Sequence, residues 1–171
     1  SRGLGDVYKR QIKGNSSLTN YDVEVLIKDD TTASFSAKGN LDVSGEKSNL
    51  DLDLKFKDFI LDPLNPFGGG AITNIRGHVT GSSKITGRLE KPQINGALIL
   101  NKGGISVPYL NIDYAFEDKT KINLAAQSFV FEAANFTATA FSSKGILRGK
   151  MSHNNFTNWS LDTTIDSERL L

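Results

Sequence analysis

The alternation of apolar and charged residues over positions 50–57 constrains the fold of this chain more than any other feature. Its apolar members are Leu50, Leu52, Leu54 and Phe56, and its charged members are Asp51, Asp53, Lys55 and Lys57. Successive side chains of a strand point to opposite faces, so this spacing gathers the apolar groups on one face, whereas a helix would scatter them around its axis. The segment is therefore predicted to be a strand with one apolar and one solvated face.

Similar runs of period two recur along the chain. They include Val23, Val25 and Ile27; Phe35 and Ala37; Ile122 and Leu124; Phe129 and Phe131; and Leu161, Thr163 and Ile165. Residues 28–30, 44–46, 101–104 and 117–119 carry turn-forming residues and are predicted to be hairpin loops, and residues 62–70 to be an exposed loop. About a dozen strands at this spacing indicate an all-β fold, with sandwich, barrel and open trough all left possible.

Composition excludes several function classes. The chain has 20 basic and 19 acidic residues, so its net charge of +1 argues against a nucleic-acid-binding protein. It has no cysteine, hence no disulfide or Cys nucleophile. His78 and His153 lie far apart and lack the spacing of a metal site, and no cofactor is expected. Asp51 and Asp53 are interpreted as part of a solvated strand face rather than as a catalytic pair.

The strand pattern leaves out the first residues of the chain. Residues 1–11, SRGLGDVYKRQ, show no alternation and are predicted to be a non-native or disordered leader. Residues 12–171 are predicted to form a single all-β segment, a fragment of a longer repetitive β-sheet protein. No apolar run approaches the roughly 20 residues of a membrane-spanning helix.

The middle of the chain carries a resemblance to a known family. Residues 77–98 read GHVTGSSKITGRLEKPQINGAL, in which a strand ending in Gly is followed by a turn with Pro92, then Ile94 and Gly96. Residues 105–114, ISVPYLNIDY, and residues 153–162, HNNFTNWSLD, continue the pattern. Over residues 33–171, and most densely over 71–117, the chain resembles the TamB (translocation and assembly module) family, C-terminal region, as found in Bacteroidetes, and more distantly its AsmA-like relatives.

The resemblance implies a curved, mainly antiparallel sheet that forms an elongated β-trough with an apolar concave face. It also implies a non-enzymatic periplasmic protein, anchored to the inner membrane through a segment outside this chain, that serves phospholipid transport or outer-membrane protein assembly. The implied partners are phospholipid acyl chains, an outer-membrane barrel assembly protein and neighbouring β-segments of the same full-length chain. The predicted lipid-contacting residues are Leu50, Leu52, Leu54, Phe56, Leu98, Leu100, Ile105, Val107, Ile112, Tyr114 and Phe116.

Two other functions remain open from the residues alone. The same apolar side chains could pack as the closed core of a structural or adhesive β-domain of a surface protein. A carbohydrate-active enzyme is disfavoured, because the acids alternate with the apolar residues and would face away from them. The discriminating property is whether the apolar faces are sealed by a second layer or stay accessible.

Overall fold

The computed structural model describes residues 7–14, 19–28, 33–138, 143–155 and 157–168. These residues form one antiparallel sheet of eleven strands and two 3-10 helices. The strands are β1 (Val7–Gly14), β2 (Asn20–Lys28), β3 (Ser34–Asp42), β4 (Asn49–Ile60), β5 (Thr73–Arg88), β6 (Lys91–Val107), β7 (Ile112–Phe116), β8 (Thr120–Ala125), β9 (Ser128–Ala138), β10 (Ser143–Asn154) and β11 (Thr157–Glu168). The 3-10 helices are η1 (Asp62–Gly68) and η2 (Pro108–Leu110). The all-β fold with antiparallel strands is confirmed.

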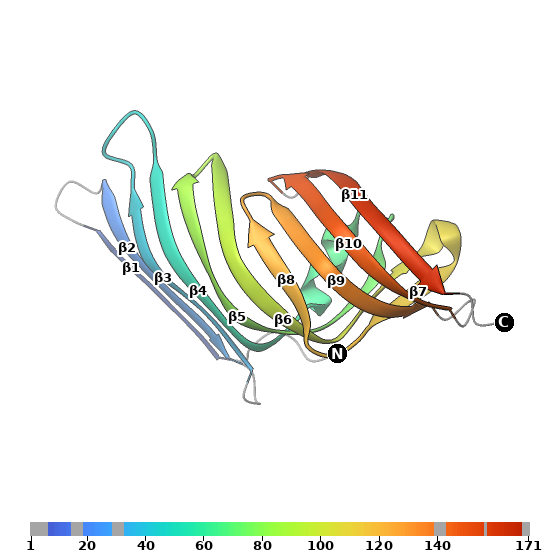
Figure 1. Cartoon of the computed structure of the whole chain (residues 1–171). Coiled ribbons are helices and arrows are strands. Elements are labelled where there is room, and N and C mark those ends of the chain that lie inside the picture. Colours follow the sequence, from blue (N-terminus) through green and yellow to red (C-terminus); the bar gives the residue numbers. More distant parts are fainter. Residues whose placement is uncertain (1–6, 15–18, 29–32, 139–142, 156, 169–171) are drawn as a thin grey trace.

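The topology is a meander in which neighbours in sequence are neighbours in the sheet (Figure 1). One departure occurs between β6 and β9. There β7 pairs with the end of β6, β8 pairs with its middle, and both pair with β9. The strands β7 and β8 thus occupy the same position in the sheet, one after the other, between β6 and β9. The pairings of β6 with β7, β7 with β9, β9 with β8 and β8 with β6 form a closed cycle.

The strand registers place the apolar residues on one face. Residues directly opposite each other in an antiparallel ladder point to the same side of the sheet. One row across the ladders contains Ala37, Leu54, Ser83, Gly96, Leu124, Phe129 and Met151, and the next contains Phe35, Phe56, Gly81, Leu98 and Ile122. We call this side of the sheet the apolar face.

The other side carries most of the charge. A row across five strands contains Glu24, Lys38, Asp53, Lys84 and Asn95. We call this side the polar face. The two-sided pattern predicted from residues 50–57 therefore extends well beyond β4.

Glycines let the backbones of β5 and β6 approach closely, and both of these long strands are curved (Figure 1). Gly81 has a φ of 150°, and a Cβ atom added to it would collide with the carbonyl oxygen of Ala97 in β6. Gly96 has a φ of 153° and faces Ser83 with similarly little room. The β5–β6 register runs unbroken through Gly87 and Gly96, so neither of these strand glycines marks a bulge in that ladder. Glycine here changes φ without shifting the register.

The prediction of a hairpin loop at residues 101–104 is wrong. These residues lie inside β6, which continues to Val107. One extra residue on β6 is absorbed between the pairs His78–Asn101 and Arg76–Gly104, where Lys102 adopts a φ of 52°. The glycine-rich pattern of residues 101–104 therefore marks a β-bulge and not a hairpin turn. A residue with positive φ, here Lys102, is found in both.

The other predicted turns have mixed outcomes. Residues 44–46 form the bend between β3 and β4, as expected, and residues 29–30 lie outside the described residues. Residues 117–119 do separate two strands, but β7 and β8 both lie between β6 and β9 and do not pair with each other as a hairpin. The predicted loop over residues 62–70 is exposed in large part but contains η1, because Pro63 and Pro66 supply backbone angles that suit a 3-10 helix. In the predicted leader, positions 7–11 belong to β1.

The best-packed part of the molecule lies at the centre of the sheet. Val79, Leu98, Leu100, Ile122 and Leu124 form a buried cluster on β5, β6 and β8. Around it pack half-buried side chains from β4, β6, β7 and β9 and from the β4–η1 junction: Phe56, Phe59, Leu61, Ile94, Phe116, Phe129 and Phe131. This cluster fixes the centre of the apolar face.

Candidate functional site: the apolar face

The structure brings all of the predicted lipid-contacting residues to the apolar face. Leu50, Leu52, Leu54 and Phe56 alternate along β4, and their partners on β3 are Leu41, Gly39, Ala37 and Phe35. Leu50 and Leu54 are buried, whereas Leu52 and Phe56 are half-buried. The β-strand pattern of residues 50–57 is confirmed, and their predicted contact with lipid stays a prediction.

The second predicted group continues the face across β6 and β7. Leu98 and Leu100 belong to the buried cluster. The half-buried pairs Ile105–Tyr114 and Val107–Ile112 lie opposite each other at the far end of β6. Phe116 stacks on Phe131 of β9 with a centroid separation of 6.3 Å and an interplanar angle of 13°. Two groups more than forty positions apart in sequence therefore contribute to one continuous surface.

Aromatic residues outside the predicted set complete this surface. Phe35 lies 5.1 Å from Phe56 and 5.7 Å from Phe59, measured between ring centroids. Phe136 contacts both Tyr114 and Phe116 at 5.3 and 6.5 Å. Their period-two spacing was visible in the sequence, but only the register shows that these strands direct them to the same face as β4.

The apolar face is buried at its centre and accessible away from it. Val79 is 2% exposed and Leu100 is 4% exposed, but no large side chain among the described residues is less than 2% exposed. The chain exposes 11024 Å² in total. A compact monomer of 18.6 kDa would expose about 8,200 Å². The chain therefore exposes about a third more surface than a compact monomer of its mass.

Ser83 and His153 are two of the polar residues on this face. Ser83 is buried at 6% exposure, and its hydroxyl has no hydrogen-bond partner among the described residues. The His153 ring lies 5.8 Å from that of Phe129. Burial lowers the pKa of His153 from its ordinary value of 6.5, because removal from water disfavours the charged ring. Neither group adds a formal charge to the face at neutral pH.

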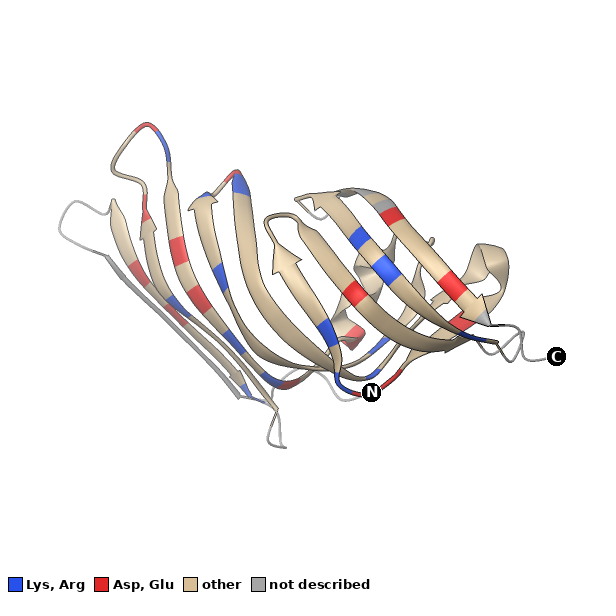
Figure 2. Ribbon diagram, in the orientation of Figure 1, with Lys and Arg blue, Asp and Glu red and all other residues tan. Residues whose placement is uncertain are grey.

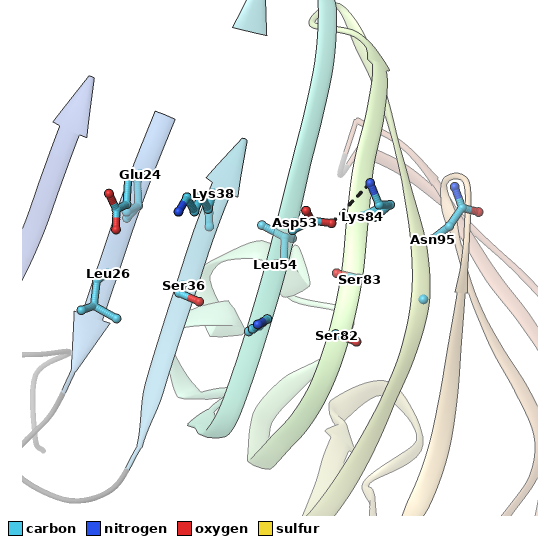
Figure 3. Close-up of a pocket in the computed structure, with 14 residues that line it drawn as sticks. Glu24, Leu26, Ser36, Lys38, Asp53, Leu54, Ser82, Ser83, Lys84 and Asn95 are labelled. Atoms are coloured by element: carbon cyan, nitrogen blue, oxygen red, sulfur yellow. Dashed lines mark ion pairs between the residues drawn. The ribbon is translucent and has the colours of Figure 1, made fainter. Parts of the chain in front are cut away.

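The polar face carries a hollow of about 590 Å³ over β2 to β6, lined among others by Glu24, Lys38, Asp53 and Lys84 (Figure 3). Acidic and basic positions lie interspersed over these strands (Figure 2). Lys84 Nζ lies 3.2 Å from Asp51 Oδ1 and 3.3 Å from Asp53 Oδ1, and hydrogen bonds to Asp51 and then Asp53 raise the pKa of Lys84. These ion pairs neutralise Lys84, and the hollow is lined by side chains of both charge signs.

This geometry agrees with the sequence interpretation of Asp51 and Asp53 as members of a solvated face, because their side chains are 60% and 62% exposed. In the part of the chain that the structure describes, no three His, Cys, Asp or Glu side chains are grouped so that they could hold a metal ion. The described residues also contain no helix of the length and apolarity needed to span a membrane.

The apolar face of the sheet is thus the strongest candidate for a ligand-binding surface among the described residues. Comparison of the chain with protein-family models, with curated proteins and with solved structures finds no match.

Proposed function

We propose that this chain is a non-enzymatic module that binds phospholipid acyl chains along the apolar face. One observation carries the proposal: the face runs across the ladders from β3 to β10, and the described residues form no second layer of strands or helices that pairs with it. A surface of this kind is unusual for a self-contained soluble domain, and it suits a ligand made of hydrocarbon.

The energetics favour such a ligand. Each CH₂ group gains about 0.8 kcal/mol on leaving water, so a chain of about 16 carbons loses roughly 12 kcal/mol when fully exposed. Half-buried residues such as Leu52, Phe56 and Ile105 can remove part of that exposure from both the protein and the lipid. The polar headgroup would stay in water at the strand ends, and no bond needs to be made or broken.

The resemblance to the TamB family gives this activity a setting. We propose that the apolar face is the concave side of a β-trough, in a periplasmic protein that bridges the inner and outer membranes. Its function would be phospholipid transport, assistance to outer-membrane protein assembly, or both, with an outer-membrane barrel assembly protein as partner. Among the described residues β1 and β11 each pair with one strand, and we propose that neighbouring β-segments of the full-length chain extend the same face.

The experiment compares two variants that place an acid on opposite faces. Leu52→Asp introduces a carboxylate on the apolar face, and Ile99→Asp, at a position 36% exposed on the polar face, is the matched control. Binding of a fluorescent fatty acid should weaken at least tenfold in Leu52→Asp and stay within twofold of the original in Ile99→Asp. Circular dichroism verifies that both variants keep their strands.

Equal binding by the two variants would contradict the proposal. So would the absence of both probe binding and co-purified phospholipid in the unmodified chain. That second outcome would favour the alternative of a structural or adhesive β-domain of a surface protein, which needs no lipid ligand.

A further inference from the structure

Four large side chains at one end of the sheet are strongly exposed. Leu64 and Phe67 of η1 are 44% and 59% exposed, and Tyr109 and Leu110 of η2 are 94% and 51% exposed. We call these four residues the apolar rim. Isolated exposed apolar residues are ordinary, but a group at one end of a fold indicates a contact surface.

The topology places both 3-10 helices at the same end of the strands. The η1 helix joins β4 to β5, and η2 joins β6 to β7; they are the green and yellow coils of Figure 1. The start of β5 pairs with the end of β6 through Thr73 and Ser106. The β5–β6 turn with Leu89 lies at the opposite end, since Arg88 pairs with Lys91.

The rim is held in place by specific hydrogen bonds. The Ile75 amide donates to Asn65 Oδ1 at 2.7 Å, and Asn65 Nδ2 donates to the Ile75 carbonyl at 2.9 Å, so one side chain of η1 pairs with β5 as a strand would. In η2, the Asn111 amide donates to the Pro108 carbonyl at 3.0 Å. The exposed side chains of η1 therefore project from a turn anchored to β5, and those of η2 project from an internally hydrogen-bonded turn.

The rim is continuous with the apolar face. Leu61, directly before η1, packs against the buried cluster, and Val107 and Ile112, on either side of η2, are half-buried members of the face. An acyl chain leaving a surface in contact with the rim would thus meet apolar side chains next.

The charges near the rim favour an uncharged or zwitterionic surface. The Arg76 guanidinium is neutralised by Asp113, and Asp62 in the first turn of η1 is acidic. Polybasic segments attract anionic lipid, and the rim lacks that feature among its described residues. Tyr, with an apolar ring and a polar hydroxyl, is instead suited to the membrane–water interface.

We propose that the apolar rim inserts into the surface of a zwitterionic phospholipid bilayer and so brings the apolar face within reach of acyl chains. This inference rests on the proposed function, because it names where the lipid would enter. It does not require a particular protein partner.

The test uses phosphatidylcholine vesicles and the complete chain. The Phe67→Ser/Tyr109→Ser variant should lose at least tenfold in vesicle binding by flotation. Leu89→Ser is the matched control, since Leu89 is 54% exposed at the other end of the sheet, and its binding should stay within twofold. All three positions are exposed, so the strands should survive, as circular dichroism will verify.

A second measurement reports insertion directly. Because the chain has no cysteine, Tyr109→Cys and Leu89→Cys each allow a single environment-sensitive dye. Vesicles should shift the emission to the blue at position 109 and not at position 89. Equal shifts, no vesicle binding by the unmodified chain, or equal losses in the two serine variants would overturn the inference.

The two proposals fail separately. If fatty-acid binding is sensitive to Leu52→Asp but vesicles are not bound, the acyl-chain face stands and the rim proposal falls. If vesicles are bound through the rim but no fatty acid binds, the proposed function is contradicted. The rim would then be a membrane contact that does not deliver lipid to the apolar face.

Discussion

Arg76 and Asp113 form a two-pronged ion pair that connects β5 to β7 across the intervening β6. Arg76 Nη1 lies 2.8 Å from Asp113 Oδ1, and Nη2 lies 2.7 Å from Oδ2. Ser106 of β6 adds a hydrogen bond from its hydroxyl to Oδ1 at 2.7 Å. This pair stabilises the end of the sheet at which the β5–β6 register shifts.

Asp113→Asn should destabilise the chain by about 1–3 kcal/mol in urea unfolding at neutral pH, because a partly buried charge-assisted pair is lost. Asp166→Asn is the control. Asp166 lies 2.7 Å from Arg148, but its side chain is 74% exposed, so its loss should cost less than about 1 kcal/mol. Equal losses would mean that burial of the Arg76–Asp113 pair has no effect on its strength.

The same pair predicts a pH dependence. Hydrogen bonding from Arg76 is the largest cause that lowers the pKa of Asp113 below its ordinary value of 3.8. The ionised carboxylate is therefore favoured in the folded state, and its stabilisation is fully present above pH 3.8 and lost as the pH falls through the lowered pKa. The free-energy difference between the original chain and Asp113→Asn should shrink over that acidic range. A constant difference would contradict this prediction.

Gly81→Ala should destabilise the fold by at least about 2 kcal/mol, because its φ of 150° strains an L-residue and the new methyl group would collide with β6. Gly45→Ala, in the β3–β4 bend, is the control, since no atom lies closer than 3.9 Å to the added Cβ. Thermal unfolding of the two variants measures the difference. Similar melting temperatures would mean that the close approach of β5 and β6 is not required.

Leu100→Ala and Ile99→Ala test which face holds the core. Leu100 is 4% exposed on the apolar face and its truncation should cost about 2–4 kcal/mol, whereas Ile99 is 36% exposed on the polar face and should cost less than about 1 kcal/mol. Denaturant unfolding gives both values. A larger loss of stability in Ile99→Ala than in Leu100→Ala would mean that the core lies on the face that carries Ile99.

Gln127 and Asn155 connect three turns at the end of the sheet opposite the rim. Gln127 Nε2 donates to the Pro92 carbonyl at 3.1 Å and to Asn155 Oδ1 at 2.9 Å, and Asn155 Nδ2 donates to the Glu90 carbonyl at 2.7 Å. Gln127→Glu keeps the acceptor of the side chain and loses both donors. Hydrogen exchange should then accelerate at the β10–β11 turn and stay unchanged at the β3–β4 bend.

The sequence predicted the strand content because alternation depends only on neighbouring residues. It identified β4 and the apolar members of β6 and β7, whose side chains do share a face. It misassigned residues 101–104, because a residue with positive φ, here Lys102, occurs in a bulge as well as in a hairpin turn. It also missed Phe35 and Phe136 as members of the site, since their faces depend on register across several ladders.

The serial pairing of the strands has a consequence for how such a molecule can change in length. Each strand from β2 to β5 pairs with its two neighbours in the chain, so hairpins can be gained or lost at that margin without changing the pairing of the other strands. Local pairing of this kind also favours progressive zipping during synthesis. The link of Asn155 to Glu90, 65 positions apart, is an exception that connects the last hairpin, β10–β11, to the central β5–β6 hairpin. Whole hairpins should therefore be added most easily outside the segment between Glu90 and Asn155.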